Sequence, residues 1–424
     1  MKKYLSKLPG DIQDLIHLVS AIAEKNNMPA YLVGGFVRDL VLGVRNLDLD
    51  IAVEGEGIKF AQALAHKLEA RLVSHKRFGT ATIHIKNGPK IDIATARLEV
   101  YPEPAHLPII SPGSLQDDHF RRDFTINAMA ISINQKDFGR LFDLYGGEGD
   151  LRKKKIRVLH GLSFIDDPTR ILRAVRFATR YNFRLELATL RLLKEAVKSG
   201  MLERVEPQRT RDEIILLLKE KRPLRALKKI QRLTGFKFLS PHLALDLPVM
   251  QLLRRLDLEI VRFSKSYPKR RPLDIWLTFF MGLVDCLSIG EVKSLCAKLS
   301  LRKGEVKRIL SYKKIGRRFI SELSSVTIKP SRIFAYLEPL SYEVIILLKA
   351  KYTGGFFQRH IADFFKVYNG MRTWICGDDL CALGLKPGPA YKRIISRVLQ
   401  ARLNGKINTK EQELLFIRRL IKKP

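Results

Sequence analysis

The stretch YLVGGFVRDLVLGVRNLDLDIAVEG (residues 31–55) places a double glycine, an arginine and two alternating aspartates in an otherwise apolar run. Its opening letters, YLVGG, predict a short strand that ends at the glycines, and a helix carrying Arg38 follows. LDLDIAVE then predicts a second strand. Because side chains alternate along a strand, Asp48 and Asp50 are expected on the same side, about 6–7 Å apart along the backbone.

Two acids on one side of an apolar strand indicate a metal site. Unpaired carboxylates would repel each other and resist burial at a cost of several kcal/mol, which a bound cation removes. Asp48 and Asp50 can share metal ions spaced about 3.5–4 Å apart, the arrangement used for in-line phosphoryl transfer. The alternative is an edge strand with two solvated aspartates.

The double glycine, Gly34 and Gly35, predicts a phosphate-binding turn. Backbone N–H groups at a strand–helix turn can approach a phosphate where side chains are missing. Arg38, one turn into the predicted helix, can add a guanidinium to the same oxygens. A glycine pair alone is weak evidence, and the order glycines, arginine, two aspartates is much stronger.

KIDIATAR (residues 90–97) carries a third carboxylate, Asp92, on another apolar strand. Asp92 is a candidate catalytic residue that completes the metal site or polarises an attacking hydroxyl. The alternative is that Asp92 is an ion-pair partner of Arg97 or of a neighbouring base.

Two further segments join charges to apolar periodicity. RRDFTINAMAI (residues 121–131) predicts an apolar helix that Asp123 caps, while an arginine reaches back to the nucleotide. The segment could equally be an ion-paired helix start.

FIDDPTRILRAVRFATR (residues 164–180) predicts a helix with charged residues at spacings of three, which align along one face. These residues are Asp167, Arg170, Arg173 and Arg176. A carboxylate accepts and a guanidinium donates, so the first two together can match the hydrogen-bonding edge of a base. The alternative is a salt-bridge ladder within the helix.

The charge of the 424-residue chain is strongly basic and uneven. The net charge is +34, yet residues 1–150 hold 18 basic and 19 acidic side chains, so the remainder carries about +35. A near-neutral α+β domain followed by a basic helical region predicts separate sites for chemistry and for polyanion binding. A ribosome-associated or merely solubilising basic region is the alternative. No membrane span or secretory signal is recognised, so we expect a cytoplasmic protein.

LVGGFVRD, LDLD, RRDFTINAMA and DDPTRILRAVRF, in this order, resemble the class II tRNA nucleotidyltransferases, the family of CCA-adding, A-adding and CC-adding enzymes and bacterial poly(A) polymerases. The resemblance implies an α+β polymerase-beta-like head with a mixed sheet, followed by an all-helical neck, body and tail. Their expected ranges are a catalytic head at 1–145, a base-recognising neck at 146–215, an RNA-binding body at 216–325 and a tRNA-binding tail at 326–424.

The resemblance also implies residue roles. Asp48 and Asp50 correspond to the metal-binding pair, and Gly35 and Arg38 to the triphosphate contacts. Arg122 corresponds to a nucleotide-binding arginine. The base-selecting template and the arginine row beside it correspond to Asp167, Arg170, Arg173 and Arg176.

The resemblance implies an enzyme that adds the 3′-terminal CCA to tRNA, with Mg²⁺ as cofactor and CTP and ATP as substrates. Three alternatives remain open: an A-adding enzyme that works with a separate CC-adding enzyme, a poly(A) polymerase, and a catalytically inactive RNA-binding protein. The connection at residues 97–120 lies where the family has a flexible loop thought to help switch specificity from C to A.

Overall fold

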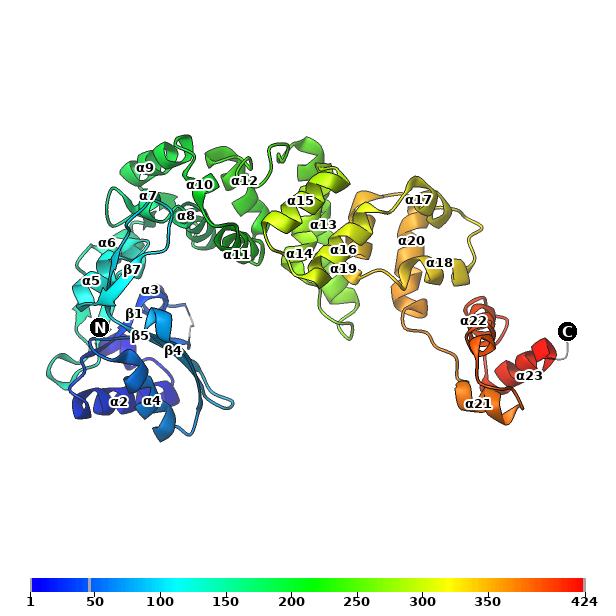
Figure 1. Ribbon diagram of the computed structural model, residues 1–424, viewed down its shortest axis with the longest axis horizontal. Helices are drawn as coiled ribbons and strands as arrows, with labels where there is room; N and C mark the ends of the chain where they lie inside the picture. The colour runs from blue at the N-terminus through cyan, green and yellow to red at the C-terminus, as the bar shows by residue number, and fades with distance from the viewer. Residues whose placement is uncertain (1, 45–46, 422–424) are drawn as a thin grey trace. The chain divides into compact units, whose positions relative to one another are not determined.

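The computed structural model describes residues 2–44 and 47–421 (Figure 1). The chain forms two compact units, Met1–Phe238 and Leu239–Pro424. The first contains a sheet followed by helices and the second is helical, which confirms the predicted order of a mixed-sheet head and a largely helical remainder. The finer division into head, neck, body and tail stays a prediction.

A seven-stranded mixed sheet in the order β3-β4-β5-β2-β1-β8-β9 forms the head. The pair β2–β5 is parallel and the other neighbours are antiparallel. Its strands are β1 (Ala30–Val33), β2 (Leu49–Val53), β3 (Arg71–His75), β4 (Thr80–His84), β5 (Lys90–Thr95), β8 (Ala130–Ser132) and β9 (Leu141–Phe142).

The centre of this sheet is apolar because it is buried. Leu32 of β1 and Leu49 and Val53 of β2 have no exposed surface, and Ile131 of β8 is equally buried. Burying such side chains stabilises the fold by about 1.5–3 kcal/mol each. The strand predictions at residues 31–33 and 49–53 are confirmed, whereas Asp48 lies just before β2 rather than within it.

The prediction of an apolar helix at residues 121–131 is wrong. A 3₁₀ turn, η2 (Thr125–Asn127), is followed by strand β8, which pairs with β1. The segment is apolar because β8 occupies an interior place in the sheet, where buried strands lose the polar–apolar alternation. Asp123 therefore does not cap a helix, and its carboxylate is available to other partners.

Helices and two small sheets complete the first unit. The hairpin β6 (Arg97–Val100) and β7 (Ile109–Pro112) occupies much of the long connection, and β10 (Lys155–Ile156) pairs with β11 (Arg184–Leu185). The helices are α1 (Lys2–Leu5), α2 (Gly10–Lys25), α3 (Gly34–Leu42), α4 (Gly57–Lys67), α5 (Leu115–Phe120), α6 (Gly147–Arg152), α7 (Ser163–Asp166), α8 (Thr169–Arg180), α9 (Leu187–Lys198), α10 (Met201–Arg204), α11 (Pro207–Leu218) and α12 (Pro223–Leu233). Short 3₁₀ turns lie at η1 (Lys76–Phe78) and η3 (Gln135–Asp137).

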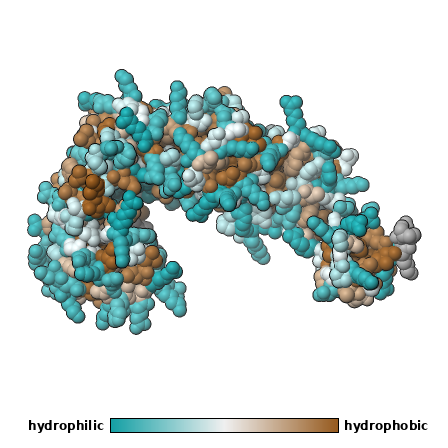
Figure 2. Space-filling model, viewed as in Figure 1, coloured by the Kyte–Doolittle hydropathy of each residue, from teal (hydrophilic) through white to brown (hydrophobic). Residues whose placement is uncertain are grey.

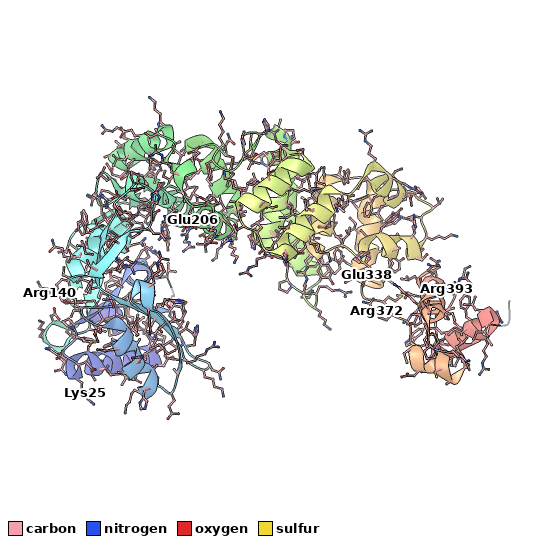
Figure 3. All side chains as sticks on the ribbon, viewed as in Figure 1. Lys25, Arg140, Glu206, Glu338, Arg372 and Arg393 are labelled. Atoms are coloured by element: carbon pink, nitrogen blue, oxygen red, sulfur yellow. The ribbon has the colours of Figure 1, made fainter. Side chains whose placement is uncertain are left out.

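The second unit is built of helices around apolar cores. Its helices are α13 (Leu247–Ser266), α14 (Ile275–Leu283), α15 (Ile289–Lys298), α16 (Lys303–Lys313), α17 (Arg317–Leu323), α18 (Pro330–Leu337), α19 (Tyr342–Lys351), α20 (Gly355–Asp363), α21 (Gly377–Ala382), α22 (Pro389–Leu403) and α23 (Lys410–Ile421), with the 3₁₀ turn η4 (Val284–Cys286) and the π-helical segment η5 (Phe364–Tyr368). Arg372 and Glu338, which are labelled in Figure 3, form an ion pair at 3.2 Å within this unit.

The visible face is mostly hydrophilic, with small scattered hydrophobic areas (Figure 2). Among the described residues, no helix combines the length and the apolar character needed to span a membrane.

Candidate active site

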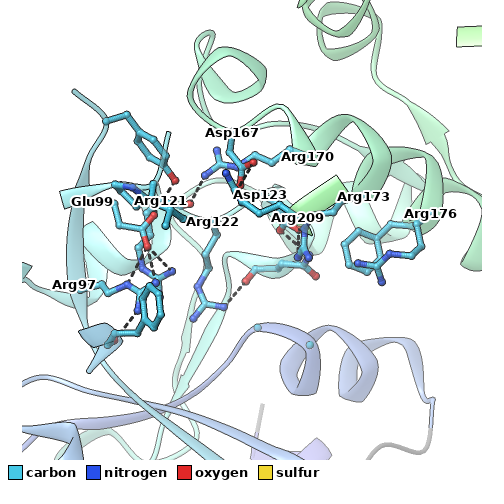
Figure 4. Close-up of a pocket in the computed structure, with 18 of the residues that line it drawn as sticks. Arg97, Glu99, Arg121, Arg122, Asp123, Asp167, Arg170, Arg173, Arg176 and Arg209 are labelled. Atoms are coloured by element: carbon cyan, nitrogen blue, oxygen red, sulfur yellow. Dashed lines mark hydrogen bonds and ion pairs between the residues drawn. The ribbon is translucent and has the colours of Figure 1, made fainter. Parts of the chain in front are cut away.

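The first unit contains a pocket of about 580 Å³ between the start of α3, the hairpin β6–β7 and helix α8 (Figure 4). Its lining is rich in arginine and includes every residue that we predicted to bind the nucleotide. These residues are Gly34, Gly35, Arg38, Arg122, Asp167, Arg170, Arg173 and Arg176. The structure therefore brings together side chains from segments more than 100 residues apart.

The double glycine lets charged groups approach the backbone. Gly34 has φ +62°, and a Cβ atom there would lie 2.6 Å from Nη1 of Arg122. A Cβ atom on Gly35 would lie 3.3 Å from Oδ2 of Asp50. Larger residues at these positions would therefore strain the backbone or displace the two charged side chains.

Two of the three predicted acids, Asp50 and Asp92, lie on the sheet beside this turn, and Asp48 lies just before strand β2. Asp50 and Asp92 are register partners on the parallel strands β2 and β5. Asp50 is half-buried, and burial together with the charge of Asp92 raises its pKa. Asp48 is exposed, and the charges of all three acids act on the ammonium group of Lys90.

Asp92 has close partners of its own. Its Oδ1 accepts a 2.6 Å hydrogen bond from the Thr82 hydroxyl, and its Oδ2 accepts one of 2.6 Å from Lys90. The alternative of an ion-paired Asp92 is met by a neighbouring base, Lys90, at 2.6 Å. The ion pairs of the described residues do not join Asp92 to Arg97, which binds Glu99. Among the described residues, Asp48, Asp50 and Asp92 are not part of the pocket lining itself.

A chain of hydrogen bonds connects the glycine turn to helix α8. Nη1 of Arg38 donates to Oδ1 of Asn127 at 2.7 Å, and Nδ2 of Asn127 donates to Oδ1 of Asp123 at 2.8 Å. Oδ2 of Asp123 accepts a 2.6 Å bond from Arg173. Burial alone would raise the pKa of Asp123, but Arg173 and the Asn127 amide outweigh it and lower the pKa to about 2.

Arg121 and Arg122 share one buried carboxylate. Nη2 of Arg122 lies 2.7 Å from Oδ2 of Asp118, and Nη2 of Arg121 lies 2.5 Å from Oδ1. Burial alone would raise the pKa of Asp118, but the two arginines lower it to about 2. Asp118 therefore stays ionised and fixes both guanidinium groups at the pocket.

Asp167 and Arg170 face the pocket but do not pair with each other. Oδ1 of Asp167 accepts from Arg209 at 2.8 Å, whereas Arg170 donates to the Ser163 hydroxyl and to the main-chain oxygen of Arg121. None of the ion pairs among the described residues joins Asp167 to an arginine of α8, which argues against the salt-bridge ladder. Each group is instead held in place by a partner outside the pair.

Two arginines of α8 are held by helix α11. Glu213 binds Arg173 through Oε1 and Arg176 through Oε2, each at 3.2 Å. The guanidinium carbons of both arginines also lie within 5.6 Å of the Phe177 ring centre. Glu213 and the Phe177 ring therefore hold both arginines, and Asp123 holds Arg173 in addition.

Sequence reasoning missed several residues of this pocket. Asn127 stands inside a motif that we quoted, and its spacing from Asp123 was the signal that could have revealed it. Glu99 accepts from Arg97 at 2.7 Å and from Tyr101 at 2.9 Å, which makes the hairpin a wall of the pocket. The alternation of RLEV predicts a strand but gives no sign of that contact.

The donor set at the turn suits a hard cation. Carboxylate oxygens are the ligands that Mg²⁺ prefers. The pKa of Asp50 is raised by burial and by the charge of Asp92, and a bound cation would offset both effects. Among the described residues, no group of three or more acids, histidines or cysteines is arranged to hold a metal ion. Asp48 and Asp50 would thus provide part of the coordination, with substrate phosphates and water as further ligands.

Comparison with known proteins agrees with this geometry. Residues 30–157 match the family model described as the poly A polymerase head domain, which covers the sheet and the glycine turn. A solved CCA-adding enzyme in its apo form superposes with a TM-score of 0.80 at 35% identity, covering 99% of this chain and 98% of that chain. The Thermotoga maritima CCA-adding enzyme complexed with tRNA gives a TM-score of 0.75 at 34% identity over 99% and 98% of the two chains.

Two curated relatives are A-adding tRNA nucleotidyltransferases. The protein from Halalkalibacterium halodurans is 31% identical over 97% of this chain and 93% of its own length. The protein from Geobacter sulfurreducens is 36% identical over 97% of this chain, but the chain spans only about half of that relative. The chain belongs to the class II tRNA nucleotidyltransferase family.

Proposed function

We propose that the protein is an A-adding tRNA nucleotidyltransferase, which completes the 3′ end of tRNA with the terminal adenosine. One observation carries the proposal: an arginine-rich pocket extends from the glycine turn beside Asp50 to Asp167 and Arg170. The long matches to A-adding relatives favour this specificity over the full CCA addition expected from sequence.

In this proposal the residues of the first unit orient the nucleotide. The turn at Gly34 and Gly35 and the guanidinium groups of Arg38 and Arg122 bind the triphosphate, because they concentrate donors and positive charge. Mg²⁺ held by Asp48 and Asp50 would supply charge stabilisation during attack by the tRNA 3′-hydroxyl on the α-phosphate.

Asp92 is proposed to polarise that hydroxyl. Its hydrogen bonds to Thr82 and Lys90 hold the carboxylate in one orientation next to Asp50. A carboxylate in such a position can accept a proton in the transition state, an effect of about 10²–10⁴-fold on rate.

Base selection is assigned to Asp167 and Arg170. The Asp167 carboxylate can accept from the exocyclic amino group of a base, and the Arg170 guanidinium can donate to a ring nitrogen. Their separate anchors, Arg209 and Ser163, keep both groups available to the same ligand edge. Arg173 and Arg176 add positive charge beside them.

Full CCA addition is the second candidate, because solved CCA-adding enzymes match this chain over nearly its whole length. The deciding experiment supplies tRNA ending at the discriminator base, at C or at CC, with labelled CTP or ATP. ATP incorporation on CC ends alone is expected. CTP incorporation on the shorter tRNAs would select CCA addition, and long A tails would select a poly(A) polymerase.

Absence of incorporation on every substrate, with retained RNA binding, would instead identify a catalytically inactive RNA-binding protein. The cytoplasmic location expected from the sequence stays a prediction.

A further inference from the structure

A second hollow lies on the opposite side of helix α8 from the nucleotide pocket. One face of α8 lines that pocket through Arg173 and Arg176, whereas Val175 and Ala178 line this hollow. The hollow consists of two adjoining cavities of about 790 and 350 Å³ that share Lys229 and three residues of the β11 region. We call it the basic groove, and its cations are Lys153, Lys154, Lys155, Arg184, Lys229 and Arg232.

Six cations and one acid leave the basic groove strongly positive, because the charge of Glu186 offsets only a small part of it, next to Lys155. In the described part of the chain, none of its six cations takes part in an ion pair. The acid in its lining, Glu186, accepts from the backbone N–H of Thr189 at the start of α9. Burial and the nearby charges of Arg232 and Arg225 lower the pKa of Lys229. Clustered unpaired cations destabilise the compact state by self-repulsion, which a bound polyanion would relieve.

The cations are spread along the groove instead of converging on one point. Lys153, Lys154 and Lys155 precede and enter β10, Arg184 lies on β11, and Lys229 lies on α12. Lysine provides four of the six cations. Its ammonium group binds phosphate as a point charge and lacks the planar geometry with which a guanidinium recognises a base. The groove floor is aliphatic, and its ring, Phe183, is buried. These features suit successive backbone phosphates and not stacked or specifically read bases.

We propose that the basic groove binds the phosphodiester backbone of RNA, as a second contact separate from the nucleotide pocket. The proposal rests on the proposed function in taking tRNA as the RNA. The phosphates could belong to a further segment of the tRNA whose 3′ end occupies the pocket or to a second tRNA molecule, since both present the same chemistry.

The test compares two triple variants that lose the same charge. Lys153→Gln, Lys154→Gln and Arg184→Gln remove exposed groove cations, whereas Lys25→Gln, Lys67→Gln and Lys86→Gln remove exposed cations elsewhere in the head. Affinity for tRNA ending in CC is measured by fluorescence anisotropy from 50 to 300 mM salt. The slope of log Kd against log salt should fall by about two to three in the groove variant, since each lost phosphate contact removes about 0.7–0.9.

Equal slopes for the two triple variants would overturn the proposal. Arg184→Gln alone, which should lower the slope by about one, gives a second measure if the triple variant unfolds. If the groove variant lost binding to a polyglutamate peptide but kept the RNA slope, the partner would be an acidic protein and the RNA proposal would be wrong.

Stoichiometry distinguishes the two sources of phosphate. If the unaltered protein binds two tRNAs and the groove variant binds one, the groove binds a second tRNA molecule. If both proteins bind one tRNA and the slope is reduced in the groove variant, the groove binds the tRNA whose 3′ end occupies the pocket. Labelled ATP incorporation by the unaltered protein is followed in parallel. If ATP is incorporated but the two triple variants have equal salt slopes, only the groove proposal is wrong. If the slopes differ but no ATP is incorporated, only the proposed activity is wrong.

Discussion

Asn127 accepts a 2.7 Å hydrogen bond from Arg38 while its own amide donates to Asp123 at 2.8 Å. The Arg38 guanidinium requires an acceptor and the Asp123 carboxylate requires a donor. The carboxamide of Asn127 provides both, through its oxygen and its NH₂ group. Asp123 is in turn bound by Arg173. Asp39 binds the Nε and Nη2 atoms of Arg38. The remaining Nη1 atom links this proposed triphosphate ligand to residues that belong to the base-selecting side of the pocket.

Asn127→Asp should make activity depend on pH in a way that Asn127→Ala does not. The new carboxyl has the shape of the amide, but it can donate to Asp123 only when it is protonated. We expect the KM for ATP to rise about tenfold near pH 8, where the new carboxylate repels Asp123, and to recover as the pH falls. In Asn127→Ala the KM should stay high throughout. Matching pH profiles of KM for the two variants would remove the positioning role.

Replacing Asp48 and Asp50 by asparagine should abolish nucleotide addition while leaving tRNA affinity within a few-fold. The change removes the charge that holds the metal, and the basic surface that binds RNA stays intact. Incorporation of labelled ATP and anisotropy with tRNA measure the two effects. Asp14→Asn, at an exposed position of α2, is the matched control. Residual activity above about one-thousandth would show that the metal assignment is wrong.

Asp167→Ala or Arg170→Ala should relax the choice between ATP and CTP. Each change removes one partner for the base edge, and such contacts discriminate by about 1–3 kcal/mol, or roughly 5- to 150-fold. The measured quantity is the ratio of kcat/KM for the two nucleotides on tRNA ending in CC. Arg191→Ala, on the exposed side of α9, should leave the ratio unchanged. An unaltered ratio in the first two variants would limit Asp167 and Arg170 to a structural role.

Stability should decline as the pH falls from about 6.5 towards 4, partly because of His119. This side chain has no exposed surface and neither ring nitrogen has a hydrogen-bond partner. Burial and the charge of Arg122 lower its pKa from 6.5 to about 4. Between these pH values His119 is protonated in the unfolded chain and neutral in the folded chain. The free energy of unfolding therefore falls by at most about 3 kcal/mol as the pH is lowered.

His119→Phe should make the acid-side loss of stability smaller by that amount. Urea unfolding at pH 4.5 and pH 7.5 measures the difference, and His66→Phe, at an exposed position of α4, is the control. An identical pH dependence in the unaltered protein and in His119→Phe would exclude this histidine as the source.

Local pattern was sufficient to predict the glycine turn, the strands beside it and helix α8. Those features depend on backbone conformation and on periodic burial, which neighbouring residues determine. The segment at 121–131 was assigned to a helix because its apolar run carries no alternation, and only the sheet partner β1 decides that it is a strand.

The partners of the charged residues could not be predicted from the sequence, because they also depend on contacts between distant segments. Asp167 is bound by Arg209 and Arg173 by Asp123, and both pairs join segments that are far apart along the chain. A motif shows which groups are present. Tertiary packing decides which guanidinium contacts which carboxylate, so the alternative of a salt-bridge ladder could not be ruled out from the sequence.

The ion pair between Asp123 and Arg173 limits where chimeras between this protein and its relatives can be joined. A cut at residue 145, the expected end of the head, would separate this carboxylate from its guanidinium and leave a buried acid without its counterion. Transplanted heads would therefore need the recipient's α8 to supply a guanidinium at the same place. An interchangeable piece of this protein must therefore extend at least from Gly34 to Arg209, because the ligand pocket is assembled from both sides of that cut.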